Sequence, residues 1–71
     1  MKSRKELENL AELEFQLFVK KIENYLVAGL SKGYTHITVP ATEFQYNKLK
    51  PLLSEFNVGD YNISSFTVWL W

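Results

Sequence analysis

The single histidine, His36, is the residue of this sequence with the widest chemical repertoire. An imidazole can act as a general base, activate a nucleophile or bind a metal ion. Catalysis of this kind needs partner groups at a suitable spacing, such as a nucleophile and an acidic residue. His36 lies in a β-branched segment without such an arrangement, and the sequence has no cysteine. We therefore interpret His36 as a partly exposed strand residue and predict no catalytic residues.

Other residues that could carry chemistry follow patterns typical of structure. The glycines at positions 29, 33 and 59 are isolated, so none begins a phosphate-binding loop. Glutamates are frequent in residues 6–14, but lysines follow them, which is typical of the solvated face of a helix. One histidine with scattered glutamates has no spacing suited to a metal site. We expect a protein that is not an enzyme and binds no metal ion or cofactor.

Composition argues against two classes of partner. The chain has 71 residues, with eight Lys and Arg against eight Asp and Glu, so its formal net charge is zero. Binding of nucleic acid through phosphates usually needs a clear basic excess, and mimicry of DNA needs the opposite. No apolar run approaches the ~20 residues of a membrane span, and no apolar signal segment follows the basic first residues. We expect a cytoplasmic protein without membrane contact.

Length and aromatic content predict a single domain over residues 1–71. Without cysteine, neither a disulfide nor a thiolate zinc site can stabilise the fold, so stability must come from apolar burial. Five Phe, four Tyr and two Trp provide large surfaces for that burial. So short a domain is near the lower limit for folding alone, and a homodimer that covers further surface is a fair expectation.

A long first helix is predicted over about residues 4–30. Ser3 and Glu6 have the spacing of a capping box at its start. Gly33 supplies a residue able to take the left-handed conformation that often ends a helix. Apolar residues recur at steps of three and four, which places them on one face. The residues of this face are Leu7, Ala11, Phe15, Phe18, Ile22, Tyr25 and Gly29.

A strand and a second helix follow. Residues 35–39 are β-branched and alternate, as in a half-buried strand. A helix is predicted within residues 43–56, because Thr42 and Gln45 repeat the capping-box spacing at its start. Pro51 interrupts this helix, either as a kink or in the first turn of a restarted helix.

The C-terminal segment, residues 61–71, is predicted to be strand after a turn at residues 57–60. Its alternation changes phase at Ser64 and Ser65. A β-bulge there gives one bent strand, and a tight turn gives a short hairpin; the composition allows both. The first phase contains Tyr61 and Ile63, and the second contains Phe66, Val68 and Leu70.

The order helix–strand–helix–strand predicts an α+β fold, a small two-layer α/β arrangement with a sheet of two or three strands. Both helices are expected on one face of the sheet, with Phe18 and Ile22 at the centre of the core, opposite Ile37 and Val39. If the two strands are adjacent and parallel, their crossover should be right-handed. Two helices that also pack on each other leave the other face of the sheet open.

The open sheet face is the first candidate interaction surface. If the second phase of the last strand points inward, the residues of opposite parity point outward. Two Trp on an open face are unusual for a monomer, and Trp is enriched at the energetic centres of interfaces. The reversed phase, with both Trp in the core, is the competing interpretation. The predicted surface consists of Trp69, Trp71, Thr67, His36 and Thr38.

A second candidate is a side stripe of the first helix, formed by Leu10, Leu13 and Leu17. These leucines project about 90–150° from the main apolar face. The stripe is either a wide extension of the core that touches the second helix, or a contact for a second subunit or a target.

The overall layout resembles a family of viral proteins. An acidic, amphipathic first helix leads to residues 33–39 (GYTHITV), a short helix with Leu52 and Leu53, and a strand ending in residues 68–71 (VWLW). In layout, over most of the chain, this is similar to the small early proteins of tailed bacteriophages of Gram-positive hosts. The resemblance implies a protein that acts in the host cytoplasm. There it would bind and inhibit a host protein, such as RNA polymerase, a replication or division factor, or a defence nuclease.

We therefore expect a protein-interaction module, with two alternatives left open. One is a nucleic-acid-binding accessory protein that stacks bases on the aromatic residues of the open face, and the other is a self-associating structural subunit. Stacking platforms place cations beside their aromatic rings. The last strand has no Lys or Arg, which makes nucleic acid the weaker alternative.

Overall fold

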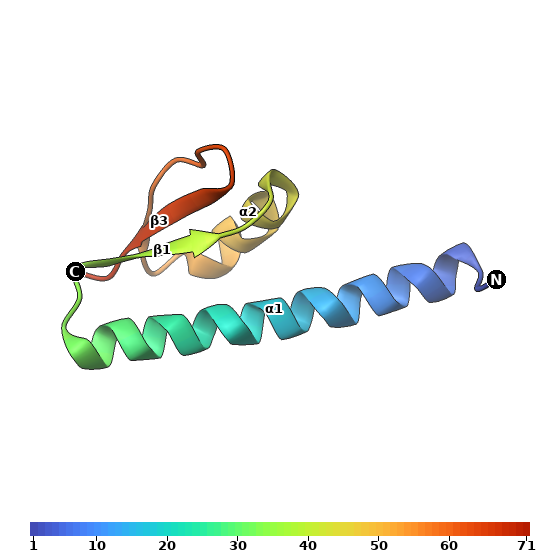
Figure 1. Cartoon of the computed structure of the whole chain (residues 1–71), viewed down its shortest axis with the longest axis horizontal. Helices are drawn as coiled ribbons and strands as arrows, with labels where there is room; N and C mark the ends of the chain where they lie inside the picture. Colours follow the sequence, from blue (N-terminus) through green and yellow to red (C-terminus); the bar gives the residue numbers. More distant parts are fainter.

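The long first helix dominates the computed structural model, which describes residues 1–71 (Figure 1). α1 spans Arg4–Lys32, so the predicted helix is confirmed and extends two residues further. Ser3 Oγ accepts a hydrogen bond from the backbone N–H of Glu6 at 3.2 Å. Gly33 ends the helix in the left-handed conformation, with φ 74°, and its N–H donates to carbonyls of the last turn.

The remaining elements form a small sheet and a short helical layer. Both halves of the second predicted capping box are present, since Gln45 N donates to Thr42 Oγ1 (3.2 Å) and Thr42 N donates to Gln45 Oε1 (2.9 Å). Pro51 lies in the first turn of a restarted 3₁₀ helix, the second of the two predicted arrangements. The elements are β1 (His36–Pro40), α2 (Glu43–Leu49), η1 (Lys50–Leu53), β2 (Asn57–Val58) and β3 (Ser65–Trp69).

The sheet has the order β1-β3-β2, and both pairs of strands are antiparallel. The parallel crossover considered from the sequence is therefore not adopted. The turn predicted at residues 57–60 is wrong, because Asn57 and Val58 pair with Trp69 and Val68, and the turn lies earlier, at residues 54–55. Two residues are too few to show an alternation, so this strand is defined only by its partner.

The change of phase before β3 is a tight turn and not a bulge. Ile63 takes a positive φ of 59°, and Ser64 N donates to the Asn62 carbonyl at 2.6 Å. Asn62 and Ser65 form an isolated antiparallel bridge across this turn. The turn lets Tyr61 and β3 both contribute to the same core, as their opposite parities require.

The core lies between one sheet face and the C-terminal half of α1. Ile22 is buried as predicted, but Phe18 is only half-buried and lies at the margin of the core, so its predicted central position is wrong. The reason is that α1 meets the sheet further along the helix, at Leu26 and Gly29. The buried residues of the core are Ile22, Leu26, Val39, Tyr46, Leu49, Leu53, Phe66, Val68 and Leu70.

The N-terminal half of α1 extends past the sheet (Figure 1). A helix of 29 residues is about 43 Å long, whereas a strand of five residues spans about 17 Å. The molecule accordingly measures 47 × 23 × 18 Å. Every residue from 1 to 14 is exposed, including Leu7 and Ala11 of the predicted core face. No helix combines the length and apolar content needed to cross a membrane.

The architecture is thus the predicted α+β fold. It consists of one long helix, a three-stranded antiparallel sheet and a short helix. The helices contribute Ile22, Leu26, Tyr46 and Leu49 to the same core as the inward residues of β1 and β3. The opposite face of the sheet is left without a covering element.

Candidate interaction surface

The open sheet face carries four residues of the first predicted surface, and the fifth, Trp71, lies two residues beyond the end of β3. Val39, Phe66 and Val68 are buried, so the second phase of the C-terminal segment points into the core. Residues of the other parity therefore point away from it. Trp69 is 45% exposed and Trp71 is 73% exposed, which rules out the competing interpretation with both indoles in the core. His36 and Thr38 are exposed, and Thr67 is half-buried between them and β2.

His36 and Trp69 form a tilted aromatic pair at one end of this face. They lie opposite each other in the β1–β3 register, with ring centroids 4.9 Å apart and an interplanar angle of 48°. Ala41 N donates to Ser64 O and Leu70 N donates to Thr35 O at the two ends of the ladder. Because hydrogen-bonded pairs alternate, His36 and Trp69 occupy a position where the side chains approach most closely.

The open face is uncharged. No Lys, Arg, Asp or Glu occurs in β1, β2 or β3, so these strands bring no acidic or strongly basic side chain to the face. His36 Nδ1 lies 3.0 Å from Thr35 Oγ1, and its ring contacts an indole. This environment offers an aromatic contact with a small number of polar groups. It suits binding by packing rather than proton transfer, because no carboxylate is bonded to the imidazole.

The free edge of β1 is poorly suited to pairing with another strand. In the ladder with β3, the backbone groups of His36, Thr38 and Pro40 point away from β3. Pro40 has no N–H, which removes one donor from that edge, and proline on an edge strand is a common protection against strand addition. A partner would therefore meet the face of the sheet and not its β1 edge.

The stripe of Leu10, Leu13 and Leu17 is exposed along α1. None of the three belongs to the core or to the residues packed against it, so the interpretation as a wide core extension is wrong. The physical reason is the position of the stripe around α1: Glu12 and Phe15 lie at the same level of the helix and contact Lys48 of α2, whereas the leucines project from the other side. The alternative interface predicted from the sequence is thus available as a surface.

One polar contact ties the overhanging half of α1 to α2. Lys48 Nζ lies 3.4 Å from Glu12 Oε2 and 4.1 Å from the centroid of the Phe15 ring. The pKa of the Glu12 carboxyl is lowered, first because the Gln16 amide donates to it and second because Lys48 is close. Both charged groups are exposed to solvent to a large extent, so this ion pair contributes little to stability.

Several exposed apolar residues were not identified from the sequence, and three of them lie in α2, in η1 and before β3. Phe44 lies on α2 off its apolar face, Leu52 follows Pro51, and Ile63 is at the tip of the turn before β3. The helical periodicity of α2 already separates Phe44 from Tyr46, Leu49 and Leu53, so this signal was present. The exposure of Leu52 and Ile63 depends on the geometry of the turns in which they lie, and the sequence contained no comparable signal for it.

Comparison of the chain with protein-family models, curated proteins and solved structures found no match. Its function is therefore argued from the geometry of its own surfaces.

Proposed function

We propose that this chain is a non-enzymatic interaction module that binds another protein through the open sheet face. The observation that supports this proposal is the exposure of two indoles at an uncharged sheet face. Trp69 projects from the side of the sheet that no helix covers, and the exposed Trp71 lies two residues beyond the end of β3. Trp concentrates at the centres of protein interfaces because a large rigid ring loses little conformational freedom when it is buried.

The area of the two indoles sets the scale of the contact. If each Trp can bury about 250 Å², their exposed fractions of 45% and 73% leave roughly 300 Å² to cover. At about 25 cal/mol per Å², this gives about 7 kcal/mol before the costs of association. Those costs are about 4–15 kcal/mol, so His36, Thr38 and Thr67 must also contribute to a stable contact.

The chemistry of the face limits the kind of partner. A charge buried against neutral residues would lack a counter-ion and would be costly, so the partner surface should be apolar at its centre. Nucleic acid fits less well, because binding of single strands combines stacking with cations that contact phosphates. The strands of this face carry no Lys or Arg.

In its finer form, the proposal is that the partner is a bacterial host protein and that binding inhibits it. The layout shared with early bacteriophage proteins supports this form. The chain would then act in the host cytoplasm on a target such as RNA polymerase, a replication or division factor, or a defence nuclease.

Capture from a lysate of a Gram-positive bacterium tests the proposal. The tagged chain is compared with Trp69→Ala/Trp71→Ala and with Phe44→Ala. Phe44 is a matched control, since it is 70% exposed, close to the 73% of Trp71, but lies on α2. We expect one stoichiometric protein that the double variant loses and the control retains, and the activity of that protein should fall when the purified chain is added.

Two results would contradict the proposal. One is a captured protein that binds the double Trp variant as well as the parent chain. The other is binding to single-stranded oligonucleotides with a steep salt dependence, which is typical of phosphate contacts and would favour the nucleic-acid alternative.

A further inference from the structure

The chain exposes more surface than a monomer of its size normally does. Its accessible surface is 5502 Å² for a mass of 8.3 kDa. A compact monomer of this mass exposes about 4,600 Å², so the excess is about 900 Å². Its radius of gyration is 13.8 Å, compared with about 11 Å for a compact domain of this length. The excess is close to the roughly 800 Å² that each partner contributes to a standard protein interface.

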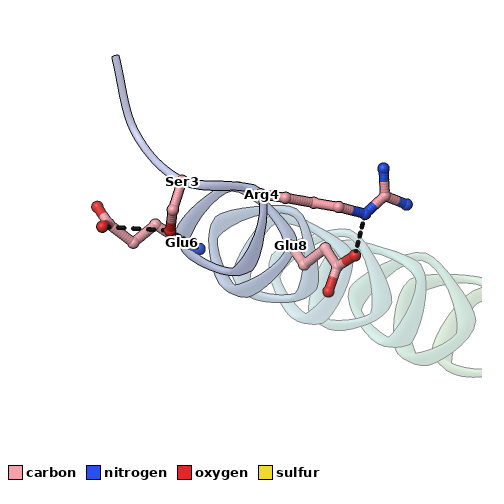
Figure 2. Close-up of polar contacts among 4 residues, drawn as sticks. All are labelled: Ser3, Arg4, Glu6 and Glu8. Atoms are coloured by element: carbon pink, nitrogen blue, oxygen red, sulfur yellow. Dashed lines mark hydrogen bonds and ion pairs between the residues drawn. The ribbon is translucent and has the colours of Figure 1, made fainter.

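The overhanging half of α1 accounts for much of this excess. Its local contacts are a cap and short-range pairs: the Ser3 hydroxyl lies 3.3 Å from Glu6 Oε1, and Arg4 Nε lies 2.8 Å from Glu8 Oε1 (Figure 2). The Arg4–Glu8 pair contributes only tenths of a kcal/mol, and a serine cap contributes about 1 kcal/mol. Most helical stability in proteins comes from packing of an apolar face, and no residue of α1 before Phe15 belongs to the core or packs against it.

The exposed leucines of α1 continue as a seam with the spacing of a coiled coil. The steps along it alternate between three and four residues, which is the a and d pattern of a heptad repeat. Leu13 and Leu17 precede the buried Ile22 and Leu26 by nine residues, half a turn at about 100° per residue. The seam therefore faces away from the core along the whole helix. Its exposed residues are Leu10, Leu13, Leu17, Lys20, Asn24 and Val27.

We propose that two copies of this chain pair through α1 in antiparallel orientation, with the seam at their interface. The two-fold axis passes near residue 15, so that Leu13 of one copy packs against Leu17 of the other. Antiparallel packing then covers most of both helices. The sheet does not obstruct this contact, because it packs on the opposite side of α1 in each copy.

Charge selects the antiparallel orientation. In a parallel pair, Lys20 would face Lys20 of the second copy within the seam, and like charges in such positions are destabilising. In the antiparallel pair, Lys20 lies over Leu10 of the second copy, with Glu6 and Glu14 one turn to either side. The acidic segment of each helix is thereby placed alongside Lys20 and Lys21 of the other.

Sedimentation equilibrium of the full chain tests the seam. The parent should be dimeric at micromolar concentrations, and Leu13→Glu/Leu17→Glu should raise the dimer Kd by at least about a hundredfold. Leu52→Glu is the matched control, because Leu52 is 60% exposed, like Leu13 (62%) and Leu17 (68%), but lies in η1. The control should dimerise as the parent does, and circular dichroism should show that both variants are folded.

Cross-linking tests the orientation and needs no seam leucine to be changed. The chain has no cysteine, so Gln16→Cys and Asn24→Cys each carry one thiol. Around an axis near residue 15, two copies of residue 16 lie within one turn of each other, whereas two copies of residue 24 are about 27 Å apart. A short bis-maleimide should therefore link the Gln16→Cys dimer and leave the Asn24→Cys variant unlinked.

The proposal is overturned by a parent chain that stays monomeric at 100 µM or more, about the weak end of specific association. It is also overturned by a dimer that survives Leu13→Glu/Leu17→Glu, or that is lost only with Trp69→Ala/Trp71→Ala. The last result would identify the sheet face as the contact between copies. Linkage through Asn24→Cys would indicate a parallel pair, in which each residue lies level with its own copy, and would equally overturn it. If the double Glu variant does not fold, the cross-linking pattern decides by itself.

Discussion

Gly29 is a buried residue at which α1 lies against Ile37 of β1 and against Leu70. A Cβ atom added there would lie 2.8 Å from Leu70 Cδ1 and 2.9 Å from Ile37 Cγ2, closer than side chains tolerate. Leu70 can withdraw, because the contact is with the end of a flexible side chain. The Ile37 methyl group is attached directly to Cβ of a β-branched residue, so β1 must move to relieve the contact.

Two effects of Gly29→Ala oppose each other. Alanine stabilises a helix interior by about 1 kcal/mol relative to glycine. Overpacking of a well-packed core costs typically about 1–3 kcal/mol. Since two contacts are violated and one cannot relax locally, we expect overpacking to prevail and the free energy of unfolding to fall by about 1 kcal/mol. For a domain of this length, that lowers Tm by roughly 4–8 °C.

Urea unfolding followed by circular dichroism measures this change, and Ala28→Gly is its control. Ala28 is the exposed neighbour of Gly29 in the same turn, so this variant reports helix propensity without packing and should lose about 1 kcal/mol. All samples need one chain concentration, because self-association would make stability concentration-dependent. If Gly29→Ala instead gains as much as Ala28→Gly loses, α1 does not approach β1 and β3 as described.

Three further predictions address the core, the turn and the open face. Ile22→Ala should lower the free energy of unfolding by roughly 2–5 kcal/mol, and Phe18→Ala by less, because Ile22 is fully buried and Phe18 is not. A larger loss for Phe18→Ala in urea titrations would refute the position of the core. Ile63→Asn should raise the free energy of unfolding by about 1 kcal/mol. Ile63 is 90% exposed and has φ 59°, a conformation that asparagine tolerates better. A lower Tm would show that the Ile63 side chain stabilises the fold. Trp69→Ala/Trp71→Ala should shift Tm by only a few degrees and leave the far-ultraviolet spectrum unchanged, whereas unfolding of this variant would show that the indoles are structural.

The helix boundaries could be predicted because their signals are local. Ser3, Gly33 and Thr42 act within one turn of the backbone that they cap, so a short window of sequence contains the whole interaction. The orientation of the side chains of β3 could be predicted from their alternation. Phe66 and Val68 alternate with Trp69, and only one of these two sets can face Val39. Neither inference required knowledge of distant contacts.

The pairing of the strands and the extent of the core could not be predicted in the same way. β2 exists because Val58 meets Val68, a contact set by the path of the chain between η1 and β3. Periodicity identified the face of α1 that packs, but not how much of that face is covered. The misplacement of Phe18 follows from this, because a helix of about 43 Å cannot be covered by strands of about 17 Å. A comparison of element lengths would have predicted the overhang.

The two candidate surfaces both face away from the core, which lets them act together. In each chain, Trp69 is exposed on the sheet face turned away from the core, and Leu13 and Leu17 project from α1 half a turn away from the core residues Ile22 and Leu26. Pairing through the seam would therefore leave an open sheet face uncovered on each copy. Such a dimer can hold two copies of a partner, or engage two sites on an assembly, and the second contact then forms at a high effective concentration without any new interaction. Such a gain would matter here, because the exposed area of the two indoles only roughly balances the cost of a single association.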